Sequence, residues 1–118
     1  DDRLSAKTEN AVLEFLRAGP ELSVDALVRL YAPDLTLPAF SLLVSRWAHD
    51  LMRSALGLQP RYFIDENAVI ERLASHTDAK RAAGFCTQAL SCRRAADHTL
   101  NPKQIVESVL LRYKQIFQ

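Results

Sequence analysis

Apolar residues recur every three or four positions in several stretches of the chain, which is the spacing that places them on one side of an α-helix. The clearest stretch predicts a helix of about nineteen residues that begins at Thr36 or Leu37 with Pro38 and ends at Gly57. Its apolar positions are Phe40, Leu43, Val44, Trp47, Leu51 and Ala55. Five further helices are predicted over residues 4–17, 23–32, 65–75, 78–96 and 102–117.

The ends of these helices are marked by residues that favour helix ends. Gly19-Pro20 ends the first helix, since glycine adopts the left-handed cap conformation and proline cannot continue the helix. Asp65 is expected to cap the helix over 65–75, and Thr77 or Asp78 the helix that follows. Asn101-Pro102 starts the last helix, with Asn as the cap and Pro in the first turn.

The pattern predicts an all-α fold, a compact bundle of five to six helices in a single domain over residues 1–118. Leu and Ala, which favour helices, make up 34 of the 118 residues. No stretch alternates with the period of a strand, and no apolar run reaches the roughly 20 residues of a membrane-spanning helix. The chain starts with Asp1-Asp2 and not with Met, so we expect it to be a fragment of a longer protein.

The segment between the third and fourth helices is predicted to be an irregular link, because Pro60 disfavours a helix there. Three of its apolar residues are expected to lie against the core: Tyr62, Phe63 and Ile64. On the long helix before the link, Arg46 and Asp50 fall outside the apolar face. Their spacing of four positions predicts a contact between them on the surface.

The residues of known catalytic, cofactor and metal sites are not found together. The three glycines, at positions 19, 57 and 84, are too far apart for a phosphate-binding loop, and the histidines are isolated. Cys86 and Cys92 would lie ~9 Å apart along one helix, too far for a disulfide. Free thiols are typical of the cytoplasm. We therefore expect no catalytic, cofactor-binding or metal-binding residues and no enzymatic activity.

The charge distribution leaves a nucleic-acid-binding domain as the alternative function. Residues 76–118 carry seven basic and three acidic side chains, whereas residues 1–35 carry four and seven. The helix over 78–96 offers polar residues that suit a DNA contact: Lys80, Arg81, Gln88, Arg93 and Arg94. Its middle is apolar, however, so the pattern favours a buried helix with basic ends.

The last helix has more apolar positions than one core contact requires. Ile105, Val109 and Ile116 form one flank, and a second flank is formed by Val106, Leu110, Tyr113 and Phe117. Interfaces between subunits commonly use aromatic and arginine residues among aliphatic ones. The predicted subunit interface is therefore Val106, Leu110, Arg112, Tyr113 and Phe117. In the alternative arrangement both flanks are buried within the domain.

Several segments resemble the C-terminal collar domain of the delta-prime subunit of bacterial DNA polymerase III, a clamp-loader subunit. The resemblance rests on their order along the chain: Leu43-Val44-Ser45-Arg46-Trp47-Ala48-His49-Asp50-Leu51, Gly57, residues 67–73, Asn101-Pro102 and Val109-Leu110-Leu111-Arg112-Tyr113. These are packing patterns, and residues before about 40 match only as helices of fitting length.

The resemblance implies a helical module that packs beside equivalent domains of the tau/gamma and delta subunits in a pentameric ring. The assembled ring loads the sliding clamp onto primed DNA and uses ATP bound by tau/gamma. The domain itself is then expected to carry no cofactor or small-molecule substrate, to meet DNA only indirectly, and to act in the cytoplasm.

Overall fold

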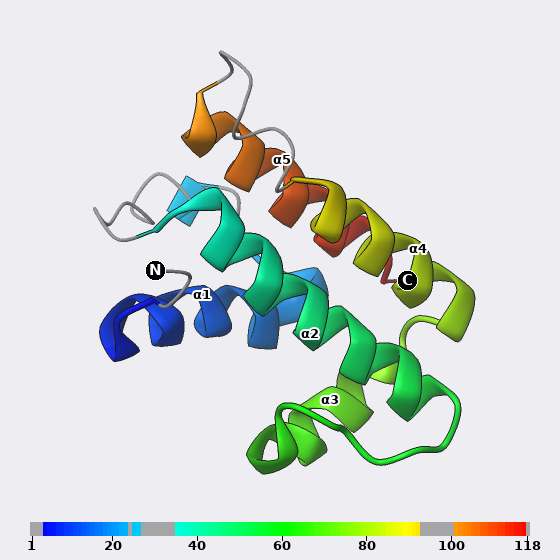
Figure 1. Cartoon of the computed structure of the whole chain (residues 1–118). Coiled ribbons are helices and arrows are strands. Elements are labelled where there is room, and N and C mark those ends of the chain that lie inside the picture. The colour runs from blue at the N-terminus through cyan, green and yellow to red at the C-terminus, as the bar shows by residue number, and fades with distance from the viewer. Residues whose placement is uncertain (1–3, 24, 27–34, 93–100, 118) are drawn as a thin grey trace.

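The computed structural model describes residues 4–23, 25–26, 35–92 and 101–117, and no β-strand occurs among them (Figure 1). The α-helices are α1 (Ala6–Ala18), α2 (Leu37–Ala55), α3 (Asn67–Ala74), α4 (Ala79–Ser91) and α5 (Pro102–Gln115). Two 3-10 turns, η1 (Gly19–Glu21) and η3 (Ile64–Glu66), follow α1 and precede α3. The prediction of an all-α bundle is confirmed.

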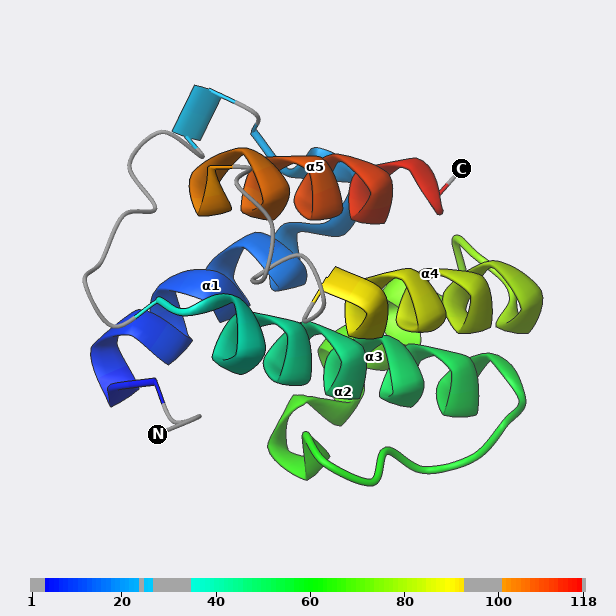
Figure 2. The same cartoon turned by 45° about the horizontal axis from the view of Figure 1, so that its top comes forward.

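Helix α2 carries the centre of the core, because its apolar face meets four other helices. It packs against α4 over much of its length, and also against α3, α1 and α5. Figures 1 and 2 show α5 on one side of the bundle and the segment joining α2 to η3 on the opposite side. The fully buried large side chains include Val12, Leu16, Phe40, Val44, Trp47, Leu51, Ile70, Phe85, Leu110 and Tyr113.

Four helices begin at a side chain that accepts a hydrogen bond from a backbone N–H group of the first turn. These capping residues are Ser5, Thr36, Asp78 and Asn101. Asn101 was predicted as a cap from the sequence, Asp78 was one of two predicted caps, and Thr36 was one of two predicted first residues of its helix, since short polar side chains directly before an apolar stripe are the usual caps. Each cap pairs one of the N–H groups that a helix start leaves without a partner.

The two glycines that were predicted to end helices adopt positive φ angles, 57° at Gly19 and 81° at Gly57. The predicted cap of α3 is wrong. Asp65 lies inside η3, and Glu66, directly before α3, makes no capping bond through its side chain. A turn of 3-10 helix leads into α3 in place of a capped start.

Asp50 was predicted on the surface next to Arg46, and this is wrong. Its side chain is fully buried, and its carboxylate accepts three backbone hydrogen bonds, from the N–H groups of Arg61 at 2.8 Å, Tyr62 at 3.0 Å and Phe63 at 2.8 Å. The buried charge is stabilised by these donors. The guanidinium carbon of Arg46 lies 5.1 Å from the centre of the Tyr62 ring instead.

Some residues predicted to face the core are exposed. Of the three apolar link residues expected to lie against the core, only Phe63 is partly buried, with its ring 5.2 Å from that of Trp47, whereas Tyr62 and Ile64 are exposed. Asp50 fixes the backbone of the link so that only one of its three apolar side chains turns inward.

Two predictions fall largely on residues outside those described. These are the helix over 23–32 and the basic end, Arg93-Arg94, of the helix over 78–96; within the described residues α4 ends at Ser91. None of the described helices has the length and apolar character needed to cross a membrane.

Candidate functional site

Most of the predicted subunit interface lies inside the domain. Val106, Leu110, Tyr113 and Phe117 are buried, and of the five predicted residues only Arg112 is exposed. The Tyr113 ring packs between aromatic neighbours, 5.4 Å from Phe85 and 5.1 Å from Phe117. This flank of α5 packs on the domain's own core, as in the alternative arrangement considered from the sequence, and Arg112 is the predicted interface residue that stays accessible to a partner.

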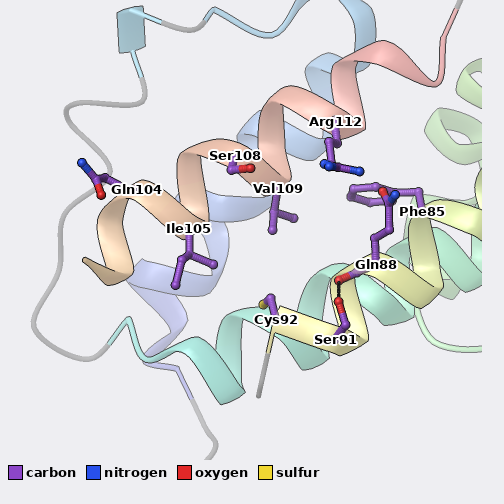
Figure 3. A pocket seen from close by; sticks show the side chains of 9 residues that line it. All are labelled: Phe85, Gln88, Ser91, Cys92, Gln104, Ile105, Ser108, Val109 and Arg112. Atoms are coloured by element: carbon purple, nitrogen blue, oxygen red, sulfur yellow. Dashed lines mark hydrogen bonds between the residues drawn. The ribbon is translucent and has the colours of Figure 1, made fainter. Parts of the chain in front are cut away.

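The opposite flank of α5 borders a groove shared with α4. The groove encloses about 390 Å³ and is lined by Phe85, Gln88, Ser91, Cys92, Gln104, Ile105, Ser108, Val109 and Arg112. Figure 3 shows Ile105 and Val109 of α5 pointing toward α4, with Cys92 pointing back toward them. The floor of the groove is therefore apolar, and amide, hydroxyl and guanidinium groups stand at its edges.

A second hollow of about 320 Å³ continues the groove toward the C-terminal end of α5. Phe85, Gln88 and Arg112 line both hollows, and the second adds Arg81, Gln115 and Ile116. Among the residues that the structure describes, no carboxylate lines either hollow, whereas two guanidinium groups do. That of Arg81 is paired with the Asp78 carboxylate at 3.6 Å, so Arg112 carries the positive charge of the edge. The groove is thus an apolar channel with a positively charged edge, which suits a partner that brings aliphatic and acidic side chains.

Neither Cys92, which lines the groove, nor Cys86 of α4 has a thiol with the character of a nucleophile. Burial raises the pKa of Cys92, which is lowered less strongly by a hydrogen bond with Ser41, and burial likewise raises the pKa of Cys86. The Cys86 thiol donates to the carbonyl oxygen of Ser45 at 3.4 Å. Because the thiolate is the reactive form, both cysteines contribute packing, and both are free of disulfides.

The described residues hold no cluster of three or more His, Cys, Asp or Glu side chains able to bind a metal ion. His49 Nδ1 lies 3.8 Å from Asp50 Oδ1, but both oxygens of that carboxylate already accept backbone hydrogen bonds. This pair serves the fold, since Asp50 is engaged in holding the link between α2 and α3.

Sequence reasoning missed the groove because its residues come from both helices and include only one of the five predicted residues. The signal that was present is the apolar flank of Ile105, Val109 and Ile116, of which Ile105 and Val109 line the first hollow and Ile116 the second.

Comparisons of the chain with models of known protein families, with curated proteins and with solved structures give no match.

Proposed function

We propose that this domain is a non-catalytic assembly module that holds its subunit in the collar of a bacterial replicative clamp loader. The tau/gamma and delta subunits would be its neighbours, and the cytoplasm its place of action. The observation that carries the proposal is the groove between α4 and α5, an apolar channel edged by Arg112 on a domain whose core is already complete.

The resemblance of the closing helix to the delta-prime collar supports this choice of surface. In the segment Val109-Leu110-Leu111-Arg112-Tyr113, three side chains are buried, and packing within the domain explains them. Leu111 and Arg112 are exposed, so internal packing gives no reason for a leucine and an arginine there. We attribute the exposed Leu111 and Arg112 to contact with a neighbouring subunit on this side of α5.

Arginine at the edge of an apolar groove is a common anchor in protein interfaces. Its planar guanidinium can bind a carboxylate through two parallel hydrogen bonds while its stem lies on apolar surface. Gln88, Gln104 and Ser108 add donors and acceptors along the same groove. This combination gives an apolar centre and a polar rim, the usual plan of a subunit interface.

The proposal is tested by mixing the chain with purified delta and tau/gamma subunits of its source organism and measuring complex formation by size-exclusion chromatography and calorimetry. The wild-type chain should bind, and Arg112→Glu should weaken binding at least tenfold. Lys80→Glu is the matched control, since Lys80 is exposed on α4 but lines neither hollow. Absence of binding by the wild-type chain would disprove the proposal.

The same purified chain also distinguishes the assembly function from the alternative, nucleic-acid binding. A nucleic-acid-binding domain would bind a DNA oligonucleotide with an affinity that falls steeply as salt is added. An assembly module alone should show no such affinity. Salt-dependent DNA binding by the chain, without subunit binding, would favour the alternative.

A further inference from the structure

The segment that joins α2 to η3, residues 56–64, presents a row of large apolar side chains to solvent. Its exposed residues are Leu56 at 60%, Leu58 at 49%, Tyr62 at 42% and Ile64 at 68% exposure. Figure 2 shows the segment running back beneath α2, on the side of the bundle away from α5. We call this surface the link surface; it is separate from the groove between α4 and α5.

The link surface is held in a fixed shape. The buried Asp50 carboxylate accepts the backbone N–H groups of residues 61–63. Nearer α2, Arg53 Nε donates to the carbonyl oxygen of Gln59 at 2.7 Å, and the N–H of Leu58 donates to the carbonyl oxygen of Arg53 at 2.8 Å. A partner would therefore meet a preorganised surface, and little conformational entropy would be lost on binding.

Two arginines converge on the exposed ring of Tyr62. The guanidinium carbons of Arg46 and Arg61 lie 5.1 Å and 5.5 Å from the ring centre, both within cation–π range. Neither has an ion-pair partner in the part of the chain that the structure describes. The nearby Asp50 carboxylate is buried and accepts backbone N–H groups, and among the described residues it forms no ion pair with either guanidinium group.

The two arginines and the apolar side chains beside them determine which kind of partner fits the link surface. Two exposed guanidinium groups beside one ring make this part of the surface positively charged, and a carboxylate brought against either of them would form a charge-assisted hydrogen bond. The flanking Leu58 and Ile64 call for aliphatic groups next to the anion. A nucleic acid would supply phosphates but no partner for these aliphatic side chains, so the surface favours a protein segment that carries both.

We infer that the link surface is a second docking site, for a segment of a neighbouring protein subunit that places an Asp or Glu carboxylate against the guanidinium groups beside Tyr62 and aliphatic side chains against Leu58 and Ile64. The inference rests on the proposed function. A subunit within a closed ring of dissimilar neighbours contacts two of them through two different surfaces. The groove between α4 and α5 provides one surface, and the link surface, on the opposite side of the bundle, provides the other.

The test uses the double variant Arg46→Glu/Arg61→Glu together with Ile64→Ser. These changes leave the backbone of residues 61–63 able to bond to Asp50, because only side chains are altered. Affinities for purified delta and tau/gamma subunits are measured for the wild type, for these variants and for Lys80→Glu as the control. An unchanged thermal unfolding midpoint checks that the variants are folded.

Each link-surface variant should lose at least tenfold in affinity for one of the two neighbours and keep wild-type affinity for the other, whereas Arg112→Glu should show the opposite preference. Unchanged affinity of the double variant for both neighbours would overturn this inference and leave the proposed function standing. If the wild-type chain binds neither delta nor tau/gamma, both this inference and the proposed function are overturned. Binding of a single-stranded oligonucleotide that is lost only in the double variant would identify the surface as a nucleic-acid site and overturn the inference alone.

Discussion

The indole N–H of Trp47 donates a hydrogen bond to the hydroxyl oxygen of Tyr113, 2.9 Å away, and that hydroxyl donates in turn to the carbonyl oxygen of Leu16 at 2.5 Å. The Leu16 carbonyl lies near the end of α1, where its regular partner four residues on would be Pro20, which has no N–H group. Tyr113 of α5 thus completes the end of α1 and pairs the only indole of the chain. Three helices, α1, α2 and α5, are joined through one hydroxyl group.

Tyr113→Phe should destabilise the domain by about 2 kcal/mol, because it leaves a buried indole donor and a buried carbonyl acceptor without partners. Urea unfolding measures the free-energy difference. Tyr62→Phe is the matched control, since the exposed Tyr62 makes ring contacts but its hydroxyl forms no hydrogen bond with any residue that the structure describes. It should change stability by less than about 0.5 kcal/mol. Equal effects of the two substitutions would contradict the role assigned to the Tyr113 hydroxyl.

The same tyrosine predicts how stability depends on alkaline pH. Burial raises the pKa of Tyr113, and the hydrogen bond from Trp47 lowers it less strongly. In the unfolded chain a tyrosine loses its proton near pH 10, whereas the folded domain keeps it. The unfolded state therefore binds fewer protons, so this contribution is fully present below about pH 10 and is lost as the pH rises above it.

Above that pH the wild-type free energy of unfolding should fall more steeply than that of Tyr113→Phe, by up to about 1.4 kcal/mol per pH unit. Urea unfolding at several pH values between 8 and 11 measures both slopes. Subtracting one slope from the other removes the contribution that all other titrating groups make to the pH dependence. Parallel slopes for the two proteins would show that Tyr113 ionises in the folded domain as readily as in the unfolded chain.

The helices and most of their ends were predictable from the sequence because they depend on neighbouring residues. Thr36, Asp78 and Asn101 each bond to a backbone N–H only two or three residues further along the chain. Asp50 was not predictable in this way. Its partners are backbone N–H groups eleven to thirteen residues away, and every non-proline residue has such a group, so no residue type marks them.

The surface residues were harder to predict than the core for a related reason. Both flanks of α5 are apolar, and the choice of the flank that faces inward depends on where α1, η1 and α4 lie. The carbonyl oxygen of Leu22 accepts a hydrogen bond from Lys114 Nζ at 2.9 Å, a contact across most of the chain that helps fix this orientation. Periodicity identified the two flanks, and only tertiary packing distinguishes Tyr113 from Arg112 as buried and exposed.

Asp50→Asn should destabilise the domain by roughly 3 kcal/mol, since an amide replaces a buried carboxylate that accepts three hydrogen bonds. The amide group also brings N–H donors toward backbone N–H donors. Hydrogen exchange measured by mass spectrometry should quicken at residues 61–63 before the rest of the domain. Asp65→Asn is the matched control, because Asp65 is exposed and caps no helix. Unchanged exchange in the segment would contradict the role given to Asp50.

The three glycines predict a graded series of alanine substitutions. At Gly19 a Cβ would clash with Leu73 Cδ2 and lie 3.6 Å from a ring carbon of Phe117, at a positive φ, so Gly19→Ala should destabilise the domain by about 3 kcal/mol. Gly57 has a positive φ in open space, and its substitution should cost about 1 kcal/mol. Gly84 lies inside α4 with nothing near its Cβ position, so Gly84→Ala should stabilise the domain by about 0.5–1 kcal/mol. Thermal unfolding of the three variants should give this order, and a stabilising Gly19→Ala would refute the packing described around that residue.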